Sequence, residues 1–227
     1  MSQRNEPAQV PQGVGLEGLR AAAAGCRACE LWEPATQTVF GEGPETARVV
    51  FVGEQPGDQE DRRGEPFVGP AGRLLDRALG DAGIDRRDAY ITNAVKHFRF
   101  TPTPKRRIHQ TPGPEHLMAC RPWLEAEFAV LKPEVVVCLG ATAAKALVSP
   151  SFRITKERGR LMPWAPPGVA AAEQGIDDAD VDEDAPHQTW MLATAHPSMV
   201  LRIPDENRAA AYDALVADLT VVAHALA

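Results

Sequence analysis

Residues 47–84 read "ARVVFVGEQPGDQEDRRGEPFVGPAGRLLDRALGDAGI", and this stretch decides the fold. Residues 47–53 are mostly β-branched or apolar and end at Gly53, which is typical of a buried strand. Residues 71–84 carry apolar side chains at helical spacing, with glycines near their end. A strand that leads through a Gly- and Pro-rich loop into a helix is the repeating unit of an α/β fold.

The rest of the chain continues this alternation. Further strands are predicted at 88–95, 133–140 and 189–197, and further helices at 114–131, 141–147 and 207–226. Such alternation indicates a mainly parallel sheet with helices on both faces. The polar, Pro-rich N-terminus predicts a disordered lead over residues 1–14. Because no internal repeat or linker composition divides the remaining chain, we predict a single domain over residues 15–227.

Composition indicates a globular cytoplasmic protein. The chain has 227 residues, of which 44% are hydrophobic, so a substantial core is expected. The N-terminal residues are polar and Pro-rich, unlike a signal peptide. No apolar run approaches the roughly 18 residues of a membrane span, so no membrane contact is expected. In a reducing compartment the four cysteines favour metal or cofactor ligation over disulfides.

The charge is unevenly distributed. The net charge is −7, and residues 173–184 hold seven acids and no base, so the remainder sums to about zero. Five cations, in contrast, crowd one short segment: Lys96, Arg99, Lys105, Arg106 and Arg107. A local basic patch affects binding to a phosphate backbone more than the global charge does. Taken alone, this segment would be interpreted first as an ordinary charged loop.

Polar and aromatic residues follow the predicted strands at their carboxyl ends, where α/β sheets bind ligands. They are Glu54, Gln55, Asp58, Asp61, Phe67, Asn93, His109 and His196. None is specific alone, because Gly/Pro-rich loops are often simple turns. Their convergence on one edge of the sheet predicts a common cleft.

Two motifs carry a resemblance to a known family. "GEQPGDQEDRRGEPFVGPAGRLLDRAL" (53–79) resembles motif A of the uracil-DNA glycosylase superfamily in its family 4 version, and "HPSMVLR" (196–202) resembles the second motif. "GEQPG" together with "KRRIHQTP" (105–112) is similar to the UdgX branch, which bonds covalently to uracil-containing DNA. The resemblance extends from Cys26 to the last helix. It implies a single-domain α/β/α sandwich with a central four-stranded parallel sheet, an iron–sulfur cluster and recognition of flipped-out uracil.

The resemblance also implies ligands for the cluster. Cys26 and Cys29 form "CRAC", and Cys120 precedes Trp123 by three positions in "ACRPW". A further family cysteine corresponds here to His97, so three cysteines and one histidine would hold a [4Fe–4S] cluster. Histidine ligates iron in Rieske centres, whereas the same residues from sequence alone would also suit structural zinc.

For the base, the resemblance and side-chain chemistry together assign roles to residues at the strand ends. Phe67 would stack under the flipped ring, and Gly53 of the same motif would also bind the substrate. The Asn93 amide offers the donor and acceptor that complement uracil O4 and N3–H, but not cytosine. His196 would donate to uracil O2 and stabilise the negative charge that grows there as the glycosidic bond breaks.

For the sugar, His109 is the predicted nucleophile at C1′, because a neutral imidazole can attack near physiological pH. Glu54 would hold its tautomer and stabilise the imidazolium, and Gln55 would fill or orient the water site. Asp58 and Asp61 would bind the substrate or organise the loop by capping backbone amides. The cations Lys105, Arg106 and Arg107 would bind flanking phosphates and close the loop as a lid.

The predicted function is therefore that of a uracil-DNA glycosylase that becomes linked to the abasic sugar through His109. Two alternatives remain: a conventional, turning-over glycosylase that uses water, and a non-enzymatic iron–sulfur DNA-binding module. The expected partner is uracil-containing DNA, with single strands preferred, and the expected state is a monomer. A role in repair, uracil sensing or defence is left open.

Overall fold

The structure, a computed structural model, describes residues 6–165 and 188–227, and the acidic stretch 173–184 lies outside them. Its central sheet has the order β2-β1-β5-β7-β6. The predicted strands form its parallel part: β1 (Val49–Gly53), β2 (Ala89–Asn93), β5 (Val135–Leu139) and β7 (Thr189–Thr194). The alternation of strands and helices thus gave the correct fold class.

The prediction of a four-stranded sheet is wrong, because a fifth strand lies at its edge. Strand β6 (Met162–Trp164) pairs antiparallel with β7. It is three residues long and has Pro163 at its centre, so it shows neither the length nor the alternation by which strands are recognised. A proline is tolerated there because an edge strand leaves one side of its backbone unpaired.

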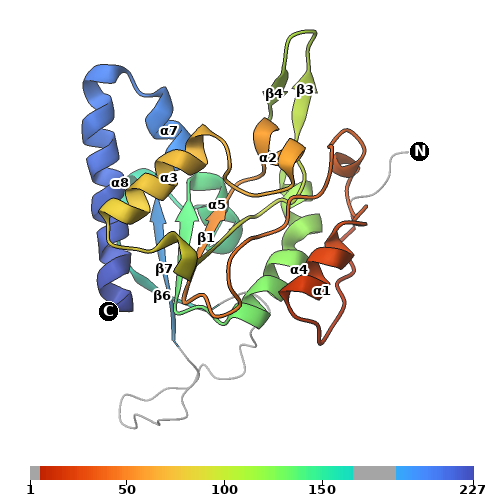
Figure 1. Cartoon of the computed structure of the whole chain (residues 1–227), viewed down its shortest axis with the longest axis horizontal. Coiled ribbons are helices and arrows are strands. Elements are labelled where there is room, and N and C mark those ends of the chain that lie inside the picture. The colour runs from red at the N-terminus through yellow and green to blue at the C-terminus, as the bar shows by residue number, and fades with distance from the viewer. Residues whose placement is uncertain (1–5, 166–187) are drawn as a thin grey trace.

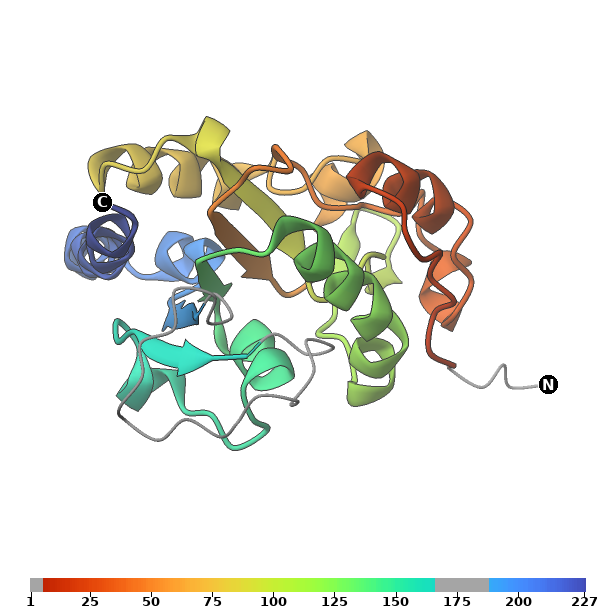
Figure 2. The ribbon, with the colours of Figure 1, turned by 90° about the horizontal axis from the view of Figure 1, so that it is seen from below.

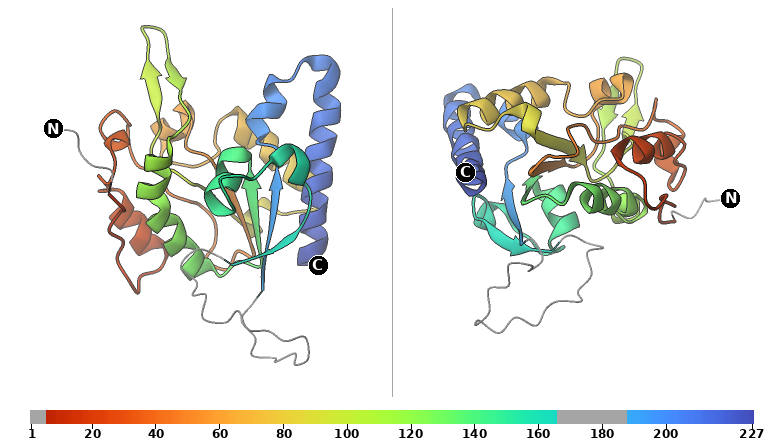
Figure 3. Two further views of the ribbon diagram at one scale, coloured as in Figure 1. Left: turned by 180° about the vertical axis from the view of Figure 1, so that it is seen from behind. Right: turned by 60° about the horizontal axis from the view of Figure 1, so that its bottom comes forward.

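Helices cover both faces of the sheet, as Figures 2 and 3 show. Alternate strand residues point to opposite faces, so Val49 and Phe51 pack with one helical layer and Val50 and Val52 with the other. The first layer contains α3 (Pro70–Asp81), α7 (Pro197–Arg202) and α8 (Asp205–Leu226). The second contains α1 (Leu16–Ala23), α4 (Pro114–Leu131) and α5 (Ala141–Leu147). The short helices are α2 (Asp58–Arg63), α6 (Ile154–Glu157), η1 (Glu30–Trp32) and η2 (Arg86–Asp88).

Part of the segment predicted as a disordered lead contacts the domain. The Glu6 backbone N–H donates to the Ala28 carbonyl at 3.1 Å, and the Ala8 N–H donates to the Ala119 carbonyl at 3.0 Å. The Ala8 side chain is buried. Residues 6–14 therefore run along the domain, in contrast to the expectation for this stretch.

Among the residues that the structure describes, one helix, α8, has the length and apolar composition that a membrane crossing requires. Core helices of soluble folds meet the same criterion. In α8 the side chains of Leu215, Leu219 and Val222 are fully buried against the sheet and α3.

The basic loop is a β-hairpin that projects from the body of the molecule (Figures 1 and 3). Its strands are β3 (Phe100–Pro102) and β4 (Arg107–His109), and His109 lies opposite Phe100. Each strand has only three residues, which is too short for an alternating pattern to predict pairing. Arg107 and His109 are two positions apart on β4, so their side chains share one face of the hairpin.

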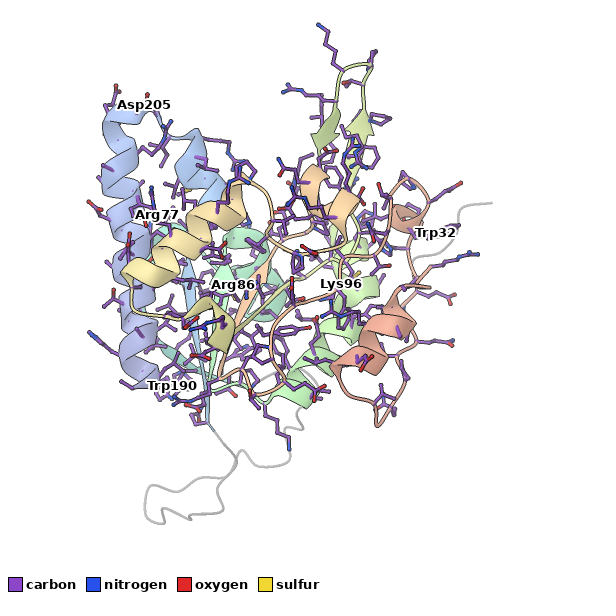
Figure 4. All side chains as sticks on the ribbon, viewed as in Figure 1. Trp32, Arg77, Arg86, Lys96, Trp190 and Asp205 are labelled. Carbon is purple, nitrogen blue, oxygen red and sulfur yellow. The ribbon has the colours of Figure 1, made fainter. Side chains whose placement is uncertain are left out.

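Lys96 was predicted to belong to the basic patch, but its side chain lies inside the fold (Figure 4) and is 1% exposed. Its ammonium group is 2.6 Å from a carboxylate oxygen of the fully buried Glu127. It also donates to Thr92 Oγ1 at 2.6 Å and to the Asn93 carbonyl at 2.9 Å. All three N–H donors of the ammonium group are therefore used, and none is left to bind a phosphate of DNA.

We expect Lys96→Met to lower the free energy of unfolding by about 3–5 kcal/mol, because it leaves the Glu127 carboxylate buried without its counter-charge. Urea denaturation measures this loss. Lys156→Met, which removes an exposed lysine from α6, is the matched control. Adding Glu127→Gln should recover part of the loss, since no uncompensated charge then remains. A Lys96→Met protein as stable as the control would contradict the role given to this ion pair.

Candidate active site

A cavity of about 640 Å³ opens at the carboxyl ends of the parallel strands. Six residues that the sequence singled out line it: Glu54, Gln55, Phe67, Asn93, His109 and His196. They come from the loop after β1, the end of β2, the projecting hairpin and the loop after β7. The predicted convergence of strand ends therefore brings these six side chains to one place.

The deep end of the cavity carries an amide with an unused acceptor. Asn93 is the last residue of β2 and is 2% exposed. Its Oδ1 is buried without a hydrogen-bond partner among the described residues. A buried acceptor left unpaired costs about 1–3 kcal/mol, so this oxygen points to a ligand that supplies a donor.

Gly53 makes room for this amide. A Cβ at Gly53 would lie 2.3 Å from Asn93 Oδ1 and 2.7 Å from the Phe67 ring. Side-chain atoms do not approach this closely, so a larger residue would displace both groups. Gly53 was predicted to bind substrate, and in the structure it shapes the cavity through the residues beside it.

Phe67 forms an aromatic wall with His196. Their ring centroids are 5.8 Å apart with an interplanar angle of 30°. The Phe67 backbone has φ +57°, a left-handed conformation that is uncommon for a bulky residue. Such conformations persist where the surroundings enforce them, and they are frequent at ligand sites.

His196 is a neutral hydrogen-bond donor in this site. Its Nδ1 accepts a hydrogen bond from the Ser198 backbone N–H at 3.1 Å, at the start of α7. This bond assigns the ring proton to Nε2. Burial lowers the pKa of His196 to about 4, so the ring stays neutral at neutral pH. Its Nε2–H is then available to an electron-rich oxygen of a ligand.

His109 and Glu54 are in direct contact at the mouth of the cavity. His109 Nε2 lies 2.9 Å from Glu54 Oε1, and the His109 side chain is 49% exposed. The other Glu54 oxygen accepts a hydrogen bond from Thr142 Oγ1. Burial acts to raise the pKa of Glu54, but the hydrogen bonds from His109 and Thr142 outweigh it and lower this pKa. Glu54 is therefore a carboxylate at neutral pH.

Gln55 fixes the base of the hairpin. Its amide nitrogen donates to the Arg99 carbonyl at 3.2 Å and to the Gln110 carbonyl at 3.0 Å, and lies 3.2 Å from His109 Nε2. Its amide oxygen accepts from the Arg99 N–H at 3.0 Å. The sequence suggested that Gln55 fills or orients a water site, whereas the structure binds its amide to the backbone on both sides of the hairpin.

Arg107 differs from its prediction as a phosphate ligand. Its guanidinium forms ion pairs with Asp58 at 2.5 Å and with Asp61 at 2.6 Å, and donates to Thr36 Oγ1 at 3.2 Å. It also lies 4.8 Å from the centroid of the Phe100 ring. Because its donors are directed into the protein, Arg107 anchors the hairpin to α2 and is not free to bind phosphate.

Asp58 and Asp61, predicted to bind substrate or organise the loop, do not line the cavity. Asp61 is fully buried, and its carboxylate accepts the Thr36 backbone N–H at 3.0 Å in addition to Arg107. The capping of a backbone amide was the predicted organising role. The ion pairs with Arg107 could not be foreseen, since they join residues 46–49 positions apart.

Two cations remain exposed at the tip of the hairpin, namely Lys105 and Arg106. On the opposite side of the cavity, Arg202 of α7 lines the wall and is also exposed. Arg202 was not among the predicted site residues, although it closes the motif "HPSMVLR". Thr142, the second residue of the helix that follows β5, was not predicted either.

A second cluster of predicted residues lies beside α4. Cys29 and Cys120 are buried in one cluster, and the Lys96 backbone N–H lies 3.4 Å from Cys120 Sγ. Hydrogen bonding to Cys120 lowers the pKa of Cys29 to about 5, against the effect of burial and with help from His97. Cys26 lies nearby, where its sulfur accepts a hydrogen bond from the Trp123 indole at 3.2 Å.

The side chains of these residues are of the types that ligate metals. Among residues 6–165 and 188–227, no set of three or more His, Cys, Asp or Glu side chains is arranged to hold a single metal ion. Yet His97 Nδ1 is buried and has no hydrogen-bond partner in the described chain, while Thr38 Oγ1 lies 2.9 Å from Nε2. An open imidazole nitrogen together with cysteine thiols is a set of donors that iron or zinc accepts.

A parallel α/β sheet with a cavity at its carboxyl edge is typical of ligand-binding α/β proteins, and a family comparison identifies which class of them this chain represents. The profile of the uracil DNA glycosylase superfamily matches residues 40–220, and the chain belongs to this superfamily.

Within the superfamily the chain is similar to type-4 uracil-DNA glycosylases. It is 45% identical to that of Thermotoga maritima over 140 residues, which cover 61% of this chain and 69% of the relative. It is 35% identical to that of Pyrobaculum aerophilum over 191 residues, or 84% and 87% of the two chains. A type-5 uracil-DNA glycosylase of the same organism is 31% identical over 148 residues, or 59% and 62%.

Proposed function

We propose that this protein excises uracil from DNA and then becomes covalently joined to the abasic sugar through His109. Membership of the superfamily and the similarity to type-4 uracil-DNA glycosylases support the excision step. The hydrogen bond between His109 and the ionised Glu54 supports the covalent step, because it lies at the mouth of the cavity that is also lined by Asn93 and His196.

Base selection would rest on the unpaired Asn93 oxygen and on the neutral His196 ring. The flipped uracil would enter beside Phe67, and its N3–H would donate to Asn93 Oδ1. As the C1′–N1 bond breaks, its electron pair moves into the uracil ring. His196 Nε2–H would stabilise the negative charge on O2. Electrostatic stabilisation of this kind is usually the largest single contribution to lowering the barrier.

The sugar would then react with the imidazole. The lone pair on the His109 nitrogen that is not bound to Glu54 forms a bond to C1′ as the uracil anion leaves. The ring becomes an imidazolium, whose proton stays in the hydrogen bond to Glu54. The resulting C–N bond has no easy path to hydrolysis, so each molecule would react once. The departing uracil takes its proton from solvent.

Denaturing electrophoresis separates this function from its alternatives. The protein is mixed with oligonucleotides that are identical except for one uracil, boiled in detergent and resolved. We expect a shifted band with the uracil oligonucleotide and none with the other. Free abasic DNA without a shifted band would favour a conventional glycosylase that uses water. Salt-dependent binding without uracil release or adduct would favour a non-enzymatic binding module.

We expect Asn93→Asp to lose most of its reaction with uracil. A carboxylate keeps an acceptor for N3–H but has no donor for O4, and sites built to bond a polar group lose about 10⁴-fold or more when the partner is missing. Single-turnover release of uracil from labelled DNA measures this rate. Asn207→Asp on the surface-exposed start of α8 is the control. A wild-type rate in Asn93→Asp would remove Asn93 as the base-reading residue.

We further propose that Cys26, Cys29, His97 and Cys120 hold a [4Fe–4S] cluster. When bound, such a cluster would supply four metal–ligand bonds that tie the N-terminal segment to α4 and to the turn after β2. The open His97 nitrogen and the low pKa of the Cys29 thiol support this assignment.

Protein purified without air should be brown and contain about four irons per chain. Metal analysis and visible absorption measure this directly. His97→Ala should lose iron, whereas Cys138→Ala, which removes a fully buried cysteine of β5 outside the cluster, should keep it. Stoichiometric zinc without iron would mean that the same residues form a structural zinc site.

A further inference from the structure

A hydroxyl group behind Glu54 has no part in the chemistry described so far. Thr142 Oγ1 donates a hydrogen bond to Glu54 Oε2, while Glu54 Oε1 lies 2.9 Å from His109 Nε2. The two oxygens of the carboxylate are thus held from two sides. Thr142, Glu54 and His109 form a continuous chain of hydrogen bonds along the cavity wall, since all three residues line the cavity.

The fold brings Thr142 to this place through paired strands. β1 and β5 are parallel neighbours, with Val52 opposite Cys138, so the segments that follow them leave the sheet side by side. Gly140, in the turn before Thr142, has φ +95°, and a Cβ there would lie 3.0 Å from His196 Cβ. The N-terminus of α5, which carries Thr142, is therefore packed closely against His196.

We propose that Thr142 is a positioning residue, which aims the Glu54 carboxylate at His109 and keeps it ionised. The terminal torsion of a glutamate is broad, so fixing one oxygen sets the direction of the other. A hydroxyl that donates to the carboxylate also favours its charged form. Thr142 would thereby set the rate at which the imidazole captures the sugar. This inference rests on the proposed covalent function.

The test compares Thr142→Val with Thr142→Ser in single-turnover adduct formation on a uracil oligonucleotide, with protein in excess. Removing a hydrogen bond to a charged group should slow Thr142→Val by roughly tenfold or more. The pH profile should change as well. Thr142 helps to lower the pKa of Glu54. Without the hydroxyl, Glu54 protonates at a higher pH, so the acid limb of the pH–rate profile shifts to higher pH. Thr142→Ser keeps the hydroxyl and should restore both rate and profile.

A double-mutant cycle separates this role from a merely structural one. If Thr142 acts through Glu54, Thr142→Val should cause little further loss in a Glu54→Gln background. Thr220→Val in α8, whose hydroxyl bonds only within its own helix to the Val216 carbonyl among the contacts described, controls for the loss of a threonine hydroxyl. Thermal unfolding of each variant checks that it is folded.

The outcomes distinguish the two proposals. A wild-type rate and unchanged pH profile in Thr142→Val, or an equal loss in both Glu54 backgrounds, would overturn the positioning role while the covalent function stands. A wild-type protein that releases uracil without any adduct would overturn the covalent function and this inference with it.

Discussion

His109→Ser is expected to abolish the detergent-stable DNA–protein band while uracil is still released. Glu54, Asn93, Phe67 and His196 keep their places in this variant, because none depends on His109 for more than one contact. The shorter side chain leaves space beside Glu54 for water, which the carboxylate can orient toward C1′. The variant should therefore turn over and leave an abasic site.

The measurement uses the same labelled oligonucleotide for both products. Denaturing gels quantify the adduct, and cleavage of abasic DNA by alkali quantifies base release. His224→Ser, which removes an exposed histidine at the end of α8, should keep the wild-type band. Mass spectrometry of the wild-type adduct should locate the modification at His109. An adduct at a lysine, or one that persists only after borohydride, would indicate a Schiff base and refute the His109 mechanism.

The position of the site could be predicted from the sequence because parallel strands end on one edge of the sheet. That rule brought Glu54, Asn93 and His196 together although they lie in different segments, and the cavity contains all three. Apolar runs and helical spacing likewise identified every parallel strand. β6 and the hairpin strands escaped detection, because strands of three residues have no measurable period.

Sequence could not divide the basic segment into its separate roles. Lys96, Arg106 and Arg107 look alike as neighbouring cations, yet one is paired inside the core, one is exposed, and one is held by α2. What separates them is the position of Glu127 and Asp61 in the folded chain. Thr142 was missed for the same reason, since its relation to Glu54 exists only across paired strands.

Arg107→Ala should slow adduct formation by about a hundredfold, since misplacing a reacting group by about 1 Å has an effect of this size. Arg107 holds β4 against α2 through Asp58 and Asp61, and His109 follows two residues later on the same face of the strand. Without the guanidinium, the fully buried Asp61 loses its counter-charge, and such losses are strongly destabilising. The hairpin would then leave the position in which Glu54 and Gln55 hold the imidazole.

Salt dependence distinguishes this anchoring role from phosphate binding. Each phosphate contact contributes about 0.9 to the slope of log affinity against log salt for duplex DNA and about 0.7 for single strands. Arg106 is one residue away and exposed. Arg106→Ala should lower the magnitude of this slope by roughly the contribution of one phosphate contact. Arg107→Ala should leave it nearly unchanged while reducing the rate, and Arg107→Lys should be intermediate because an ammonium cannot engage both aspartates as a planar fork does. The opposite pattern, a lower slope with an unchanged rate at saturating DNA, would return Arg107 to the phosphate-binding set. It would also mean that Gln55 alone is sufficient to fix the hairpin over the sugar.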